Sequence, residues 1–135
     1  MSRTACSLAL CAAFLAACSE KPTMENMAGS YHATSFTVQQ GAAPAENVLA
    51  DGSLLDLTLI AAGTTSGRLF VPGGAEGGGD FDADLTGTWT LLGTAVTFDH
   101  VADTFVRDMP FTAKVGQLTG EATFGGATIR VVLER

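Results

Sequence analysis

Short runs of alternating apolar and polar residues, separated by glycine turns, fill the chain from residue 29 to its end. In one of the longest runs, Phe81, Ala83 and Leu85 alternate with aspartates at the positions between them. A repeat of two residues is typical of a β-strand with one buried and one exposed face. The dipeptide Gly125-Gly126 between two such runs is typical of a two-residue hairpin turn. These features predict an all-β protein made of consecutive antiparallel hairpins.

Eight runs of this kind follow one another at spacings of about 8–12 residues. The expected strands are residues 29–39, 53–60, 64–71, 81–91, 95–100, 109–115, 118–124 and 129–133. Helical periodicity is absent, apart from what could be a single turn around residues 47–50. Eight strands joined by tight turns favour an up-and-down β-barrel, because closure removes both exposed edges. A two-sheet sandwich stays an alternative, whereas short strands and the lack of aromatic girdles disfavour a transmembrane barrel.

The first eighteen residues have the layout of a secretion signal. Arg3 supplies a positive charge, and an apolar run follows from Leu8 to Ala17. This run is shorter than the roughly 20 residues that a membrane-spanning helix needs. Its length fits the apolar part of a signal peptide. An ordinary signal cleaved after small residues is one interpretation of this segment.

A more specific interpretation rests on Leu15-Ala16-Ala17-Cys18, which resembles the bacterial lipobox. The resemblance implies cleavage before Cys18, a diacylglycerol on its thiol and a fatty acid such as palmitate on its new amine. Two or more acyl chains hold a protein stably on a membrane.

The resemblance therefore implies a signal peptide at residues 1–17, a lipidated cysteine and tether at 18–28, and a barrel domain at 29–135. Ser19 follows the cysteine. By similarity to Gram-negative sorting rules, this residue favours the outer membrane of the bacterial cell envelope.

Gly29-Ser30-Tyr31 opens the first expected strand, and Gly87-Thr88-Trp89 repeats this triplet of glycine, any residue and an aromatic residue. The barrel region thereby resembles lipocalins and their wider calycin relatives, in which Gly-x-Trp opens the first strand. The order of lipobox, short tether and eight-strand meander is similar to that of bacterial lipocalin-like lipoproteins. In lipocalins a basic residue of the last strand packs over the first-strand aromatic. The resemblance thus implies that Arg130 packs over Tyr31.

Charge and cysteine content exclude several classes of function. The chain has 14 acidic and 7 basic residues, a net charge of −7, whereas nucleic-acid binding needs clustered Lys and Arg. All three cysteines lie within the first 18 residues, so we expect neither a disulfide nor a free thiol in the barrel. Motifs for a nucleophile elbow, a zinc protease or a phosphate-binding loop are missing. We therefore expect a monomer that needs no cofactor and is not an enzyme.

Asp80, Asp82 and Asp84 form the most unusual polar pattern. Alternate residues of a strand share a face, which would place these carboxylates about 6.5–7 Å apart. Clustered carboxylates are ligands of hard cations such as Ca²⁺. However, Leu85 stands where a calcium loop has its glycine, and Leu91 where it has its glutamate. We favour a solvated outer strand face, with these aspartates as weak metal-site candidates only.

A second polar cluster contains Asp99, His100, Asp103 and Asp108. A histidine between acids could bind a metal or act as a base. Because no nucleophile motif accompanies it, we favour a polar loop at the mouth of the barrel. The glycine-rich residues 73–79 are expected to form a second loop near that mouth.

An eight-stranded barrel is just wide enough to be filled by its own side chains or to hold one small ligand. We predict non-catalytic binding of a small hydrophobic molecule or lipid as the first hypothesis. Its expected wall residues are Tyr31, Trp89, Phe98, Phe111 and Phe124. The alternative is a filled barrel that serves as a structural or protein-interaction module of the envelope. Small inward residues such as Gly87 and Gly120 fit either case, because they leave open volume or make room for aromatic rings.

Overall fold

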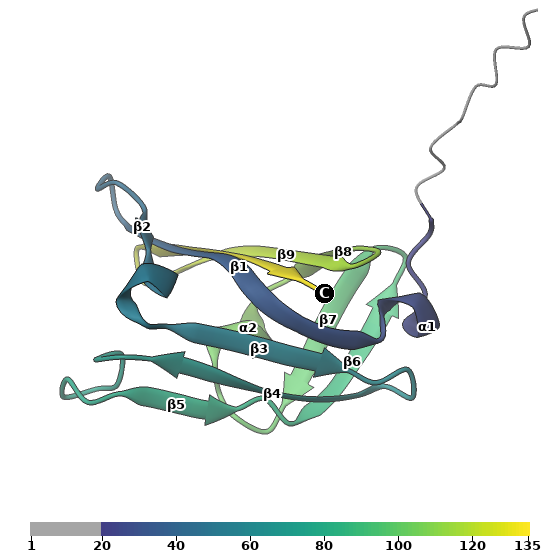
Figure 1. Ribbon diagram of the computed structural model, residues 1–135. Helices are drawn as coiled ribbons and strands as arrows, with labels where there is room; N and C mark the ends of the chain where they lie inside the picture. Colours follow the sequence, from purple (N-terminus) through teal and green to yellow (C-terminus); the bar gives the residue numbers. More distant parts are fainter. Residues whose placement is uncertain (1–19) are drawn as a thin grey trace, which may run out of the picture.

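The computed structural model describes residues 20–135, which form a closed antiparallel β-barrel (Figure 1). The elements are α1 (Met24–Met27), β1 (Gly29–Gln40), β2 (Glu46–Asn47), the 3-10 helix η1 (Val48–Asp51), β3 (Leu54–Leu59), β4 (Thr64–Val71), β5 (Phe81–Asp84), β6 (Gly87–Leu92), β7 (Ala95–His100), α2 (Phe105–Asp108), β8 (Phe111–Lys114), β9 (Gln117–Phe124) and β10 (Ala127–Glu134). No helix in this part of the chain is long and apolar enough to cross a bilayer.

The barrel closes because β1 pairs with both β3 and β10. Its first four residues pair with β3, where Tyr31 lies opposite Leu57. Its ladder with β10 begins at His32 and runs to Gln40, with a register shift between Ala33 and Ser35. The remaining strands pair with their neighbours in chain order. The up-and-down connectivity and the strand number agree with the prediction of an eight-stranded barrel.

One expected strand, residues 81–91, is divided into β5 and β6. Both halves pair with β4, which makes them one interrupted strand of the barrel. At the interruption, the Leu85 amide donates to the Gly67 carbonyl at 3.0 Å. The Leu85 carbonyl accepts from the Thr65 hydroxyl, also at 3.0 Å. The buried backbone of Leu85 is thus hydrogen-bonded although the ladder is broken.

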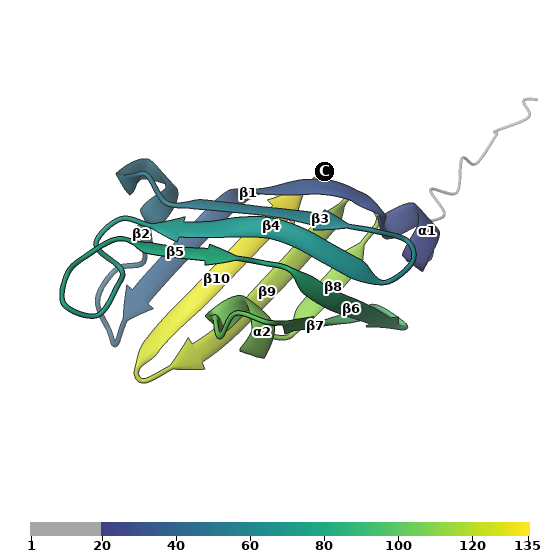
Figure 2. The ribbon, with the colours of Figure 1, turned by 90° about the horizontal axis from the view of Figure 1, so that it is seen from below.

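Strand direction alternates around the barrel, which gives it two different ends (Figures 1 and 2). The α1 end carries α1 and the β3–β4, β6–β7 and β8–β9 turns. The opposite end, called the cavity end after the cavity described below, carries the β4–β5 loop (residues 72–80), the β9–β10 turn at Gly125-Gly126 and β2. Gly125 and Gly126 both have positive φ, +54° and +84°, as a type I′ hairpin turn requires. The chain enters the barrel at the α1 end.

The α1 end has a packed interior. Tyr31 donates a hydrogen bond of 2.7 Å to the Met27 carbonyl. The indole Nε1 of Trp89 donates to the Ile60 carbonyl at 2.8 Å. Both aromatic side chains are buried, and so is Met27. Part of the segment that was expected to be a tether therefore packs against the barrel as α1.

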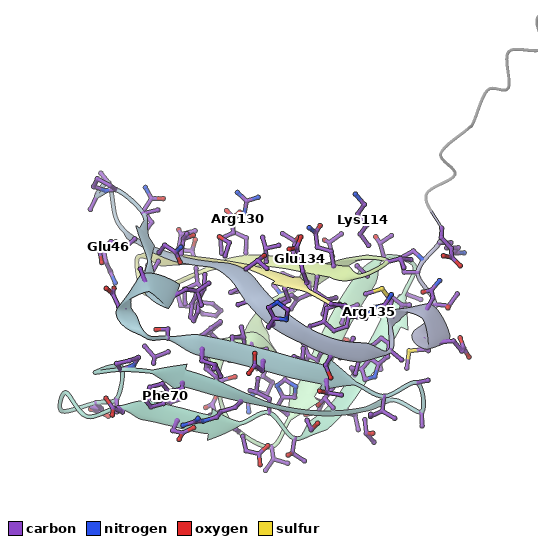
Figure 3. All side chains as sticks on the ribbon, in the orientation of Figure 1. Glu46, Phe70, Lys114, Arg130, Glu134 and Arg135 are labelled. Carbon is purple, nitrogen blue, oxygen red and sulfur yellow. The ribbon has the colours of Figure 1, made fainter. Side chains whose placement is uncertain are left out.

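The prediction that Arg130 packs over Tyr31 is wrong. Arg130 is exposed and lies opposite Thr37, six positions along β1 from Tyr31. Figure 3 shows it projecting from the outer face of the barrel, whereas Arg135 lies beside α1. Burial raises the pKa of the Tyr31 hydroxyl, and the positive charge of Arg135 opposes that shift. The basic residue near the first-strand aromatic is therefore Arg135, just beyond the end of β10.

Candidate functional site

A cavity of about 480 Å³ occupies the cavity end of the barrel. This volume lies in the range of small-molecule sites, roughly 300–1,000 Å³. Its apolar lining comes from five strands, α2 and the β4–β5 loop. The apolar lining residues are Phe36, Val38, Leu69, Val71, Gly74, Phe81, Phe105, Phe124 and Ile129.

Strand alternation explains why residues far apart in the sequence meet in this cavity. The strands β1, β4 and β9 run toward the cavity end, so the later residues of each, such as Val38, Val71 and Phe124, lie there. The strands β5 and β10 run away from it, so lining residues near their beginnings, Phe81 and Ile129, lie there too. The lining is therefore a consequence of the up-and-down topology.

All polar residues that line the cavity come from one segment, residues 103–108. They are Asp103, Thr104 and Asp108. Arg107 of the same segment pairs with Asp103, and its Nε lies 3.1 Å from an oxygen of Asp108. These contacts raise the pKa of the Arg107 guanidinium, chiefly through the hydrogen bond to Asp108. The cavity thus has one polar wall, with two carboxylates and one guanidinium beside it.

Three buried polar atoms near this wall have no hydrogen-bond partner: Nδ1 and Nε2 of His100 and Oγ1 of Thr104. His100 is 2% exposed and Thr104 is 5% exposed. Burial lowers the pKa of His100, the charge of Asp99 opposes this shift, and Arg107 adds to it. A buried unpaired polar group costs about 1–3 kcal/mol. The connection between β7 and β8 is therefore a weak part of the barrel, and those strands pair at only two positions.

The structure separates the five predicted wall residues. Phe124 lines the cavity. Tyr31 and Trp89 lie in the packed α1 end. Phe98 and Phe111 pack edge to face at 5.3 Å between ring centroids, and they belong to the buried core.

Sequence reasoning missed three cavity phenylalanines, Phe36, Phe81 and Phe105. The rings of Phe36 and Phe105 lie 5.4 Å apart at a tilt of 47°, a favourable aromatic geometry. Phe36 and Phe81 stand at inward positions of their expected strands. Strand direction could have assigned both residues to the end that carries residues 73–79.

The small inward residues Gly87 and Gly120 make room for neighbouring groups. A Cβ on Gly120 would lie 2.5 Å from Met109 Sδ and 2.7 Å from Phe111 Cε1. A Cβ on Gly87 would lie 2.2 Å from the Asp99 carbonyl oxygen. The first glycine accommodates core side chains, and the second allows β6 and β7 to approach closely.

The three aspartates of β5 and its preceding loop form hydrogen bonds with three different residues. The Asp80 carboxylate accepts from the Gly73 amide at 3.1 Å. Asp82 forms two hydrogen bonds with Arg68, at 2.9 and 2.8 Å, which lower the pKa of its carboxyl group. Asp84 accepts from the hydroxyl of Thr86. Within residues 20–135, no three His, Cys, Asp or Glu side chains are grouped as a metal site.

Cys18, the predicted lipidation site, lies outside the described residues. Comparisons with protein-family models, curated proteins and solved structures found no match to this chain.

Proposed function

We propose that this protein is a bacterial envelope lipoprotein whose barrel binds a small apolar molecule without transforming it. The observation that carries the binding proposal is the cavity of about 480 Å³ with its apolar lining. Apolar cavities with a few grouped polar residues are the usual form of small-molecule sites. Four of the lining residues are phenylalanines: Phe36, Phe81, Phe105 and Phe124.

Anchoring through Cys18 and the place of α1 together suggest an orientation. Residues 19–23 separate Cys18 from α1, a distance of at most roughly 20 Å in extended chain. The α1 end would therefore lie at the membrane. The cavity end, on the far side of the barrel (Figure 1), would face the aqueous compartment.

The distribution of charge supports this orientation. The β4–β5 loop and the segment at residues 99–108 carry five acidic residues, and Arg107 is their one Lys or Arg. Anionic lipid surfaces repel acidic segments, so the cavity end is unsuited to contact such a membrane. The ligand would then exchange with the aqueous compartment that the cavity end faces.

Native mass spectrometry of residues 19–135, exported to a bacterial periplasm without the lipid anchor, tests the binding proposal. Every strand pairing and core residue described above lies within this segment. We expect a stoichiometric mass increment that disappears on denaturation. A bare polypeptide mass, even after incubation with an extract of envelope lipids, would contradict binding and favour the filled-barrel interaction module.

A matched pair of variants assigns the bound mass to the cavity. Ile129→Phe enlarges a side chain that lines the cavity, whereas Ile60→Phe makes the same change at an exposed position of the α1 end. We expect the first variant to lose most of the bound mass and the second to retain it. Equal retention by both variants would place the ligand elsewhere.

A further inference from the structure

The polar wall of the cavity determines where a ligand's polar group must lie. The other walls are made of phenylalanine, valine, leucine, isoleucine and one glycine. A polar group placed against them would lose its hydrogen bonds to water and gain none in return. An amphiphilic ligand therefore places its headgroup beside residues 103–108.

Negative charge predominates at this wall. Both charged side chains that line the cavity within the described part of the chain are carboxylates, Asp103 and Asp108. Arg107 lies between them and pairs with both, and its side chain is not part of the lining. The three groups together keep one net negative charge on the cavity side.

The neighbouring loop adds to this negative field. The β4–β5 loop contributes Gly74 to the cavity lining, and it carries Glu76 and Asp80. No basic residue occurs in residues 72–84. Charges of one sign lining a cleft with low-dielectric walls concentrate the opposite ion there.

The aromatic lining of the cavity also favours a positively charged ligand. Phe105 directly precedes Val106 and Arg107 in the polar segment, and its ring packs against that of Phe36. The faces of aromatic rings attract cations, with energies that increase as the cation loses water. A cationic headgroup beside residues 103–108 would thus meet carboxylates and phenylalanine rings together.

We infer that the cavity prefers an apolar molecule with a cationic amine headgroup over the corresponding carboxylate. This inference rests on the proposed binding function and names the ligand class for that same cavity. A long-chain fatty acid, the obvious apolar ligand of an envelope barrel, would place its carboxylate against Asp103 and Asp108.

Calorimetric titration of residues 19–135 with dodecylamine, dodecanol and dodecanoate at neutral pH tests the preference. The three probes share one alkyl chain and differ in headgroup charge. We expect affinity to fall in that order, with at least about a tenfold difference between the amine and the carboxylate. The difference should shrink at high salt, because the carboxylates are partly exposed.

Charge variants test whether negative charge at the polar wall attracts the headgroup of the ligand. Asp103→Asn and Asp108→Asn should each weaken dodecylamine binding by roughly threefold, and Arg107→Gln should strengthen it by a similar factor. Dodecanol binding should change less than dodecylamine binding in each variant, because its headgroup carries no charge. The control Asp56→Asn removes the same charge from an exposed position on β3 outside the cavity lining, and should leave every affinity unchanged.

The possible outcomes distinguish failure of the amine preference from failure of the binding proposal on which it rests. Dodecanoate binding as tightly as dodecylamine would overturn the preference and leave apolar binding intact. An equal effect of Asp56→Asn and Asp103→Asn would also overturn it, because the attraction would then come from overall charge. If none of the three probes binds, the binding proposal and the inference fail together.

Discussion

The side chain of Arg135 packs across the backbone of Gly29. A Cβ on Gly29 would lie 2.5 Å from Arg135 Cδ, and Gly29 has a φ of +144°. Nη1 of Arg135 donates to the carbonyls of Asn26 and Ala28, at 2.7 and 3.0 Å. Arg135, which follows β10, thus holds the end of α1 and the start of β1 in place through these contacts.

The first prediction concerns this contact. Gly29→Ala should lower the free energy of unfolding by about 2 kcal/mol, because alanine is strained at this φ and displaces Arg135. Arg135→Ala should cost about 1 kcal/mol through its lost hydrogen bonds. In urea denaturation, the double variant should lose less than the sum of the two.

The control for this cycle is Gly79→Ala, where φ is not positive and no atom lies within 4 Å of the added Cβ. It should change the free energy of unfolding by less than about 0.5 kcal/mol. Additive losses in the double variant would show that Gly29 and Arg135 act independently.

The second prediction concerns pH and His100. Its ordinary pKa is 6.5, and burial lowers it in the folded protein. As the pH falls below about 6.5, the unfolded chain takes up the proton first, so the folded state loses stability. The loss ends once the pH is below the lowered pKa, where both states are protonated. Thermal unfolding of the wild type should therefore show a falling melting temperature between about pH 7 and pH 5.

The variant His100→Leu should flatten that part of the pH profile and raise stability near neutral pH by about 1 kcal/mol. Its side chain removes two buried nitrogens that have no hydrogen-bond partner. The exposed histidine of β1 provides the control, and His32→Leu should keep the wild-type slope. An unchanged slope in His100→Leu would assign the pH dependence to other groups.

The third prediction uses Trp89, the only tryptophan in the chain. Because it is buried and outside the cavity lining, its emission should be blue-shifted and resist acrylamide. Saturation with dodecylamine should leave that emission unchanged. A Phe124→Trp variant, with a new indole in the cavity wall, should respond to the same titration. A response from the wild type would restore Trp89 as a wall residue.

The fourth prediction tests the anchor. Cys18→Ala should release the protein from the membrane fraction, because each buried CH₂ of an acyl chain contributes about 0.8 kcal/mol to membrane binding. Cys11→Ala alters another cysteine of the proposed signal peptide and should leave the protein membrane-bound. If the Cys18→Ala protein still sediments with washed membranes, something other than lipidation holds it there.

Alternation and glycine turns were enough to predict the barrel, because each strand buries one face and each hairpin is local. The β9–β10 hairpin shows this, since Phe124 and Ala127 pair across Gly125-Gly126 as the turn requires. The interruption of the strand between β5 and β6 was not predictable. It depends on hydrogen bonds between the backbone of Leu85 and two residues of β4, Gly67 and Thr65, about 20 positions earlier in the chain.

The sequence leaves the inward face undecided where both faces of a strand are apolar. Leu54 and Leu55, or Leu69 and Phe70, have the same local pattern whichever side is inward. The barrel buries Leu55 and Leu69, while Arg68 covers the outward ring of Phe70 at 5.0 Å. Pairing with the neighbouring strands determines which of the two adjacent residues faces the barrel interior.

The cavity was less predictable than the fold, because it depends on which barrel end each aromatic residue reaches. Trp89 and Phe124 both lie on inward faces, yet one is in the packed end and the other in the cavity. The α2 segment was also missed, because four residues are too few to show helical periodicity. Asp108 of α2 forms the polar wall together with Asp103 and Thr104, which directly precede this helix.

The two ends of the barrel chain lie side by side, with His32 opposite Glu134 and Arg135 against Gly29. Neighbouring termini permit circular permutation. A chain that is opened at Gly125-Gly126 and joined from Arg135 to Glu20 would keep every strand pairing. Its new N-terminus, and any lipid attached there, would stand at the opposite pole of the barrel. The cavity end would then face the bilayer. Comparison of the permuted protein with the original would show whether the ligand enters from the membrane or from water.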